Sequence, residues 1–595
     1  MSFKRETVLL VVILAASLGM RMLPIASDLP YFCSSFDEMN YIESALRFGT
    51  GSLKMLSYFH GALYPLVLFL EYAAYFVLGR MVGIFSSATD FFLAYIKDPT
   101  SFVLLARATV ALCGVGIIWL SYAIAARVYH QRVGLVASLF TAFSLLMFQM
   151  SFLALADILS VFLLMLATYF AVRSVEQPKE RWFYCAALLI GLAAASKYHT
   201  GFGIVTLYVA AFMKSAEHEQ RIRAFVGLAV TGSLFVGLGF CLGMPQFLLE
   251  PDVFYEHVFQ RLGGQMLGYN PEGNAWLFLF THHLRNGLGI PLEVASLLGI
   301  CLAVYNRSKW DILILSFPIS FYLLFMHSVG WAYHLVPAIP FLLILAARLV
   351  DVIADKFLRR ESLAMSLLLG AVVTTPTFLD SIRLVEVMRS PSTKTMAKTW
   401  IEEHIPGGAT IMAEGYFYTD PTFVPPLVEN PSALERDLAF VKMNNGTGRT
   451  TMLRLVHYDD LYGNARAYDV RKVRLLDSED ITRDQPRYLI MTSFMDSEVG
   501  TNELSGMFVN GNYNERRQAV EAAIQRRNAV KENIRRSYKI LATIAPTVTF
   551  SAFFPHLMNE DYRLIRNWPL FSQGGSKGPT ITIWERRSEV ALGRN

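Results

Sequence analysis

An acidic pair, Asp37-Glu38, is the strongest candidate for chemistry in this sequence. The pair closely follows residues 7–24, an apolar stretch that predicts a membrane-spanning helix. Carboxylates are costly near lipid, so two adjacent ones at a membrane surface indicate catalysis there. An alternative stays open, because Ser35 and Glu38 have capping-box spacing and both acids could simply complement a helix dipole. Since a cap would fix Glu38 and leave Asp37 free, Asp37 is the better catalytic candidate.

A second acidic residue, Asp157, lies at the junction of two apolar stretches. It could cap a helix that begins at Ile158, which would be a structural role. Alternatively, Asp157 and the Asp37-Glu38 pair could share a divalent cation or bind a polar acceptor. Carboxylate oxygens suit Mg²⁺, Mn²⁺ or Ca²⁺, so Asp157 is a candidate metal ligand.

Several basic side chains could bind an anionic substrate. Lys197 and His199 lie in a short polar turn between apolar stretches. A lysine there is often only an interfacial anchor, but a phosphate at the membrane surface also needs a cation at that depth. Arg261 could serve likewise, and single histidines border two other apolar stretches. The candidate substrate-binding residues are His60, Asp157, Lys197, His199, Arg261 and His334.

The composition predicts an integral membrane protein. Of the 595 residues, 54% are hydrophobic and 17% are charged, and the mean hydropathy is +0.38. The five cysteines form no CxxC, so neither a disulfide framework nor a zinc site is indicated. Lys4 and Arg5 before an apolar run would also fit a signal peptide. Because further long apolar stretches follow and no convincing cleavage site precedes Asp37, we expect an uncleaved first helix.

The positions of basic loops predict the topology. Loops rich in Lys and Arg at 127–132, 173–181, 214–223, 306–309 and 355–360 alternate with loops that are poorer in both. The positive-inside rule places these loops and the N-terminus in the cytoplasm, which gives about eleven spans and an external C-terminal segment. The predicted spans are 7–24, 102–126, 133–154, 158–172, 182–196, 201–213, 224–243, 288–304, 312–327, 334–350 and 362–379.

Residues 61–85 are long enough to span, but Glu71 would lie near the middle of that helix. If this stretch crossed completely, every later basic loop would face the wrong side. We therefore interpret it as re-entrant or interfacial helices within a first external loop, residues 25–101. With this topology, the candidate residues gather on the external face.

The composition changes in the last third of the chain. Charged and turn residues become frequent, short strand-like runs appear, and one long charged helix is predicted. We expect a transmembrane domain over residues 1–385 and an extracytoplasmic α/β or α+β domain over 386–595. The expected strands are 409–413, 487–493 and 579–586, and the expected helix is 514–541.

The order of these signals resembles the C-type (GT-C) membrane glycosyltransferase superfamily. The resemblance is closest to the protein O-mannosyltransferases and lipid A aminoarabinose transferases, the PMT_2-like type of glycosyltransferase family 39. It covers residues 1 to 415 and rests on motifs in a fixed order. These are Asp37-Glu38, His60-Gly61-Ala62-Leu63, Ala106-Arg107, Asp157, Ser196-Lys197, the 244–254 loop, the 333–349 helix and the 397–411 entry to the external domain.

Two positions depart from the pattern of those families. Gly61-Ala62 stand where Pro-Pro is usual, and Tyr333-His334 stand where Arg-Tyr is usual. The second departure removes a cation that often lies beside the donor phosphate.

The resemblance implies sugar transfer from a polyprenyl-phosphate carrier (dolichyl or undecaprenyl) to a glycan, lipid or protein acceptor. The reaction would take place on the extracytoplasmic side of a bacterial or archaeal cell membrane, with no nucleic-acid partner. Asp37 would be the general base for the acceptor hydroxyl. Lys197, or else Arg261, would neutralise the leaving phosphate, and Asp157 would bind a metal or the acceptor. Residues 61–85 could line a groove for the polyprenyl tail.

Two other classes of function remain open. A transporter or flippase of lipid-linked sugars usually has internal repeats and charged or broken helices near mid-membrane, and neither feature is visible here. A membrane scaffold would use the external domain only for binding. An Asp37→Asn variant with an intact phenotype would favour the scaffold.

Overall fold

The computed structural model describes most of the chain. Contacts divide it into two compact units: the first comprises residues 1–25, 37–75 and 103–385, and the second 26–36, 76–102 and 386–595. The described residues are 5–31, 36–56, 58, 61–177, 179–216, 219–256, 279–325, 332–358, 363–415, 424–443, 448–492, 513–545 and 580–587.

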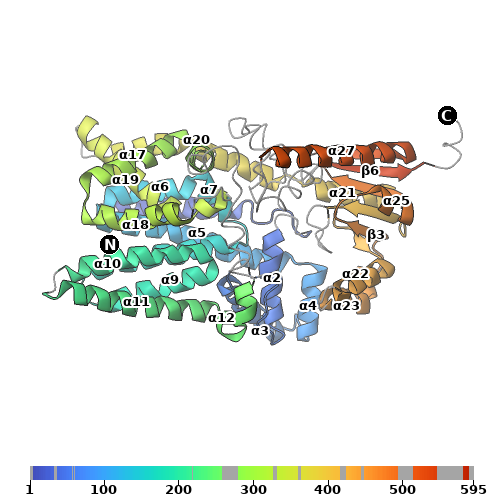
Figure 1. The fold of residues 1–595 in the computed structure, drawn as a ribbon, viewed down its shortest axis with the longest axis horizontal. Coiled ribbons are helices and arrows are strands. Elements are labelled where there is room, and N and C mark those ends of the chain that lie inside the picture. The colour runs from blue at the N-terminus through green and yellow to red at the C-terminus, as the bar shows by residue number, and fades with distance from the viewer. Residues whose placement is uncertain are drawn as a thin grey trace. The chain divides into compact units, whose positions relative to one another are not determined.

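The first unit is built from helices (Figure 1), and every predicted span except one coincides with a single long helix. The predicted span 133–154 is broken, because the helix stops at Phe143 and resumes at Leu145. The Thr377 hydroxyl accepts the freed Leu145 N–H at 2.8 Å, which satisfies the backbone at the break. The long helices are α1 (Arg5–Met22), α5 (Thr100–Val128), α6 (Gln131–Phe143), α8 (Ala156–Glu176), α9 (Arg181–Ser196), α10 (Gly203–Ser215), α11 (Arg221–Gly243), α17 (Ile290–Asn306), α18 (Lys309–Phe325), α19 (Ile339–Leu358) and α20 (Leu363–Arg389).

Short elements connect these helices and carry much of the site. They are α2 (Phe36–Phe48), α7 (Leu145–Met150), η1 (Tyr198–Phe202), α12 (Gln246–Leu249), α13 (Pro251–Phe254), η3 (Leu279–Leu284), α16 (Arg285–Leu288) and η4 (Ala332–Leu335).

Within the described residues, five stretches are long and apolar enough to cross a membrane. They are Leu63–Met81, Thr100–Val128, Ala156–Glu176, Arg221–Gly243 and Leu363–His404.

Small residues let neighbouring helices approach closely. Figure 1 shows α9, α10 and α11 side by side. A Cβ on Gly191 would lie 2.0 Å from the Val236 carbonyl oxygen, and one on Gly239 would lie 2.2 Å from the Leu188 oxygen. Backbone-to-backbone packing through glycines is typical of helices in membranes, where lipid tails remove the hydrophobic drive for association.

The predicted cytoplasmic loops gather at one end of the first unit. Arg127 pairs with Glu176 at 3.1 Å, and Arg132 pairs with Asp355 at 3.1 Å, so the ends of α5, α8 and α19 lie near the start of α6. Asp157 is at the opposite end of α8 from Glu176. The structure thus separates the basic loops from the candidate site as expected, while the side that each end faces stays a prediction.

The stretch 61–85 forms one continuous helix, α3 (Leu63–Met81), where re-entrant or interfacial helices were expected. By length and composition it could cross a membrane. Its hydrogen bonds to α5 lie near the beginning of that helix: the Tyr64 hydroxyl donates to the Ala106 carbonyl at 3.0 Å, and Thr109 donates to Glu71 at 2.6 Å. These contacts with the first turns of α5 favour an interfacial position, which remains a prediction.

The second unit contains a six-stranded sheet of order β2-β3-β1-β4-β6-β5. The first four strands in that order are parallel, and β6 is antiparallel to both of its neighbours, β4 and β5. The strands are β1 (Thr410–Glu414), β2 (Val428–Glu429), β3 (Ala467–Val473), β4 (Tyr488–Thr492), β5 (Tyr538–Ile544) and β6 (Ile581–Arg586). The α/β expectation is therefore confirmed.

Helices cover both faces of this sheet. Ile411 of β1 packs with Ile401 of α21 (Thr393–His404), whereas the next residue, Met412, packs with Ile534 of α27 (Tyr513–Ser537). This alternation follows from the two-residue period of a strand. Figure 1 shows α27 running along the sheet. The remaining helices are α4 (Ala88–Lys97), α22 (Pro431–Met443), α23 (Arg449–Val456), α24 (Tyr458–Tyr462) and α25 (Ser478–Asp484).

Candidate functional site

The centre of the candidate site is a buried ion pair between Asp157 and Lys197. The Lys197 Nζ lies 3.1 Å from both carboxylate oxygens of Asp157. Asp157 is only 4% exposed and Lys197 only 5%. Charges this deeply buried are normally paired, and removal of one partner leaves the other uncompensated.

Local backbone structure explains why the two side chains meet. α9 ends at Ser196, whose hydroxyl donates to the Ala156 carbonyl at 3.0 Å, so the end of α9 is held against the start of α8. Lys197 then adopts an extended backbone conformation before η1 begins. The cap role considered for Asp157 is wrong, because Leu155 is the N-cap of α8 and Asp157 lies in its first turn.

Two predicted histidines adjoin this pair. The rings of His199 and His334 are 5.7 Å apart. The Lys197 ammonium lies 5.0 Å from the centroid of the Tyr333 ring, which is itself in contact with His334. The structure therefore brings together four of the predicted substrate-binding residues, from α8, the α9–η1 junction and η4: Asp157, Lys197, His199 and His334.

Glu38 forms a second buried ion pair, with Arg107 of α5. The Arg107 Nε and Nη2 donate to the two Glu38 oxygens at 2.8 and 2.9 Å, and both side chains are fully buried. The Ala154 N–H also donates to Glu38 at 2.7 Å, and Arg107 Nη1 donates to the Ile25 carbonyl at 2.8 Å. Glu38 thus ties α2 to α5 and to the chain just before Asp157.

Arg107 was missing from the candidates chosen on chemistry, although it belongs to the motifs that carried the resemblance. The signal that could have identified it is a lone arginine in an apolar span, which requires a buried partner.

The other candidates lie wholly or partly outside the described residues. Asp37 is in the first turn of α2, but its side chain is outside them, as are His60 and Arg261. Their roles stay predictions.

The described residues do not fit a metal ion at Asp157. Its carboxylate is held by an ammonium group, which would repel a divalent cation. Within the described ranges, no three His, Cys, Asp or Glu side chains converge on one point.

Gly61, one of the departures from the family pattern, has a steric reason. Its N–H donates to the Ser196 carbonyl at 3.3 Å, and a Cβ there would lie 1.7 Å from the Ala195 oxygen. Proline could neither donate this bond nor fit the space. Glycine therefore permits the loop after α2 to contact the end of α9, next to Lys197.

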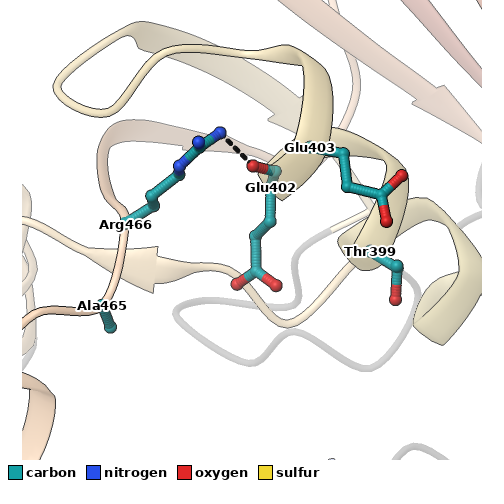
Figure 2. A pocket seen from close by; sticks show the side chains of 5 residues that line it. All are labelled: Thr399, Glu402, Glu403, Ala465 and Arg466. Carbon is teal, nitrogen blue, oxygen red and sulfur yellow. Dashed lines mark hydrogen bonds between the residues drawn. The ribbon is translucent and has the colours of Figure 1, made fainter.

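A shallow surface depression of about 630 Å³ lies on the second unit (Figure 2). Arg466, on one side, donates to the Glu402 carbonyl on the other. The residues that line the depression are Thr399, Glu402, Glu403, Ala465 and Arg466, and none of them was predicted as a site residue.

Comparison with known proteins gives one family match and several similar structures. Residues 93–258 match the family of dolichyl-phosphate-mannose-protein mannosyltransferases. No curated protein matches the chain. The apo oligosaccharyltransferase of Archaeoglobus fulgidus is 11% identical, with 98% of this chain and 88% of that chain covered and a TM-score of 0.51. The chain shares its fold with this oligosaccharyltransferase.

Two further structures are similar. The archaeal oligosaccharyltransferase AglB from Archaeoglobus fulgidus, in complex with an inhibitory peptide and a dolichol-phosphate, is 12% identical (98% and 88% covered, TM-score 0.50). ArnT from Cupriavidus metallidurans, bound to undecaprenyl phosphate, is 14% identical (82% and 94% covered, TM-score 0.47). The family match contains Arg107, Asp157, Lys197 and His199, and so includes most of the site that the structure assembles.

Proposed function

We propose that this protein is a membrane glycosyltransferase that uses a polyprenyl-phosphate-linked sugar as donor. The observation that carries the proposal is the buried Asp157–Lys197 pair inside the region matched by the mannosyltransferase family. A solved protein of the same fold binds dolichol-phosphate, which is the type of lipid that such a donor releases.

The chemistry follows from the charges of the site. In the transfer, the bond between the anomeric carbon and the carrier phosphate breaks, and a bond to the acceptor oxygen forms. The phosphate leaves as an anion, and the acceptor hydroxyl loses its proton to a base. Asp37 is our candidate for that base. Lys197 is a buried cation fixed by Asp157, so it would stabilise the developing negative charge more than it could in bulk solvent.

Asp157 and Glu38 support this site from different directions. Asp157 holds the Lys197 ammonium in place. Glu38 accepts a hydrogen bond from the Ala154 N–H and so holds the segment that precedes Asp157. We therefore assign Glu38 a positioning role, while Asp37 retains the catalytic one.

The experiment is donor turnover by full-length protein in proteoliposomes. The probe is polyprenyl-phosphate mannose with a cell-envelope extract as acceptor, and the product measured is free polyprenyl phosphate. We expect turnover by the wild type and a loss of about 10²–10³ in rate for Lys197→Met, as for removal of one group that stabilises a leaving anion. Lys54→Met is the matched control, because that lysine is exposed and outside the site. Movement of labelled donor across the bilayer without release of polyprenyl phosphate would favour a flippase instead.

A further inference from the structure

The loop between α2 and α3 is fastened to the Lys197 turn on both sides of residues 59–60. On one side, the Tyr198 hydroxyl donates to the Tyr58 carbonyl at 3.0 Å. On the other side, the Gly61 N–H donates to the Ser196 carbonyl at 3.3 Å. The two residues that flank Lys197 therefore each hold this loop.

A third segment, between α12 and α13, holds the same loop through Glu250. The Glu250 carboxylate accepts a hydrogen bond from the Tyr58 hydroxyl at 3.0 Å and pairs with Lys54 at 3.2 Å. The Gln246 amide adds a bond to the Leu53 carbonyl at 2.8 Å. Burial and the neighbouring Glu250 raise the pKa of Tyr58 to about 12, so the phenol remains a donor at neutral pH.

The side chains between Glu250 and Lys197 are well packed. Tyr58 is 6% exposed and belongs to a buried apolar cluster that also contains Phe254 and Ala195, with Tyr198 packed against it. The Tyr198 and Phe254 rings are 6.1 Å apart in an edge-to-face arrangement. Since the cluster leaves little room for adjustment, loss of the Glu250 carboxylate would remove the acceptor of the buried Tyr58 O–H and displace the loop.

We propose that Glu250 is a positioning residue for the transfer reaction. Through Tyr58 and Tyr198, it fixes the turn that presents the Lys197 ammonium to the phosphate of the donor. The inference rests on the proposed function. Displacement of a catalytic group by as little as about 1 Å can lower a rate by a factor of about 10².

The contact between Glu250 and Lys54 contributes much less to holding the loop. The Lys54 side chain is 62% exposed, and ion pairs exposed to solvent contribute little. Lys54→Met therefore provides a matched control that removes one Glu250 contact and leaves the Tyr58 bond intact.

The test combines kinetics with hydrogen exchange on full-length protein in nanodiscs. We expect Glu250→Ala and Tyr58→Phe each to lower kcat/KM for polyprenyl-phosphate mannose about tenfold or more, with wild-type values for Lys54→Met. Glu250→Gln should retain most activity, since its amide oxygen still accepts the Tyr58 proton. Because both act through one contact, the Glu250→Ala/Tyr58→Phe double variant should be no slower than the worse single variant. Hydrogen exchange of residues 196–202 should rise in both single variants and stay unchanged in Lys54→Met.

The two readouts separate the two proposals. If the wild type turns over no donor, the proposed function fails. Hydrogen exchange of residues 196–202 still tests whether Glu250 and Tyr58 hold this turn. If Tyr58→Phe and Glu250→Ala keep both wild-type turnover and wild-type exchange, Glu250 has no positioning role. Additive losses in the double variant would contradict the shared pathway.

Discussion

The two buried ion pairs place opposite charges where a membrane protein can least tolerate an unpaired one. Asp157–Lys197 is adjacent to the histidines and could present its ammonium to a ligand, whereas Glu38–Arg107 is enclosed on all sides by backbone and side-chain partners. Because their surroundings differ, we assign the two ion pairs different roles. The first pair suits an anionic substrate, and the second suits support of the protein framework.

The Glu38–Arg107 pair predicts a large effect on stability. Glu38→Gln should lower the free energy of unfolding by about 3–5 kcal/mol, because it leaves the Arg107 guanidinium buried without a countercharge. The measurement is the apparent thermal midpoint of purified protein in detergent. The double variant Glu38→Gln/Arg107→Met should recover much of the loss, since it removes both charges. A double variant that is as unstable as the sum of the single variants would contradict this explanation.

Asp437 in the second unit predicts a pH dependence. Burial raises its pKa to about 6, with Glu429 adding to the effect and Lys472 opposing it. The folded state therefore binds a proton that the unfolded state, with an ordinary pKa of about 3.9, has already lost. Asp437 then contributes stability at pH 4 that is lost as the pH rises through 6. Asp437→Asn removes this titration, so its thermal midpoint relative to wild type should rise by several degrees between pH 4 and pH 7.

The control for this prediction is Asp460→Asn, since the Asp460 side chain is 84% exposed. Its midpoint relative to wild type should be the same at both pH values. A relative midpoint for Asp437→Asn that is constant or falls with pH would show that Asp437 is not the group responsible.

At the scale of elements, most helices of the first unit could be predicted, because a bilayer needs roughly 20 apolar residues per span. The break at Ser144 could not, since its satisfaction by Thr377 depends on a helix far away in the sequence. In the second unit, β2, β3 and β5 were missed: β2 has only two residues, β3 alternates apolar with polar residues, and β5 begins inside the predicted helix 514–541. The predicted helix 514–541 also ends early: from Tyr538 the chain pairs with β6 in preference to continuing α27.

The site shows the same limits. The residue types at Asp157 and Lys197 marked them as candidates, but their direct pairing depends on how α8 and α9 meet. The spacing of Ser35 and Glu38 indicated a capping box. The actual partner of Glu38, Arg107, is on another helix and could not be identified from local spacing.

Packing of α9 against α11 predicts contrasting effects for two glycines on the same helix. Gly239→Ala should destabilise by about 1–3 kcal/mol, because its Cβ would lie 2.2 Å from the Leu188 carbonyl oxygen. Gly237→Ala should be neutral or slightly stabilising, since nothing lies within 4 Å of its Cβ and alanine is the better helix former. Thermal midpoints of the two variants provide the comparison. Equal losses would show that α9 and α11 do not pack as described.

At the scale of the whole molecule, transfer on the external side requires the site and the basic loops to face opposite sides of the membrane. Lys54→Cys, near the site, should react with a membrane-impermeant maleimide in intact cells, whereas Arg307→Cys, in a basic loop, should react only after the cells are opened. Both variants need a background without Cys33, which lies in the predicted external loop, and without Cys185 and Cys301, which are exposed. The reverse pattern would place the site in the cytoplasm and exclude transfer on the external side.

The most direct measurement is retention of polyprenyl phosphate by the intact protein in native mass spectrometry. The account predicts that wild type and Lys54→Met carry one bound polyprenyl phosphate, and that Lys197→Met loses most of it at the same lipid concentration. Equal retention by Lys197→Met would contradict the claim that this ammonium binds the phosphate of the carrier.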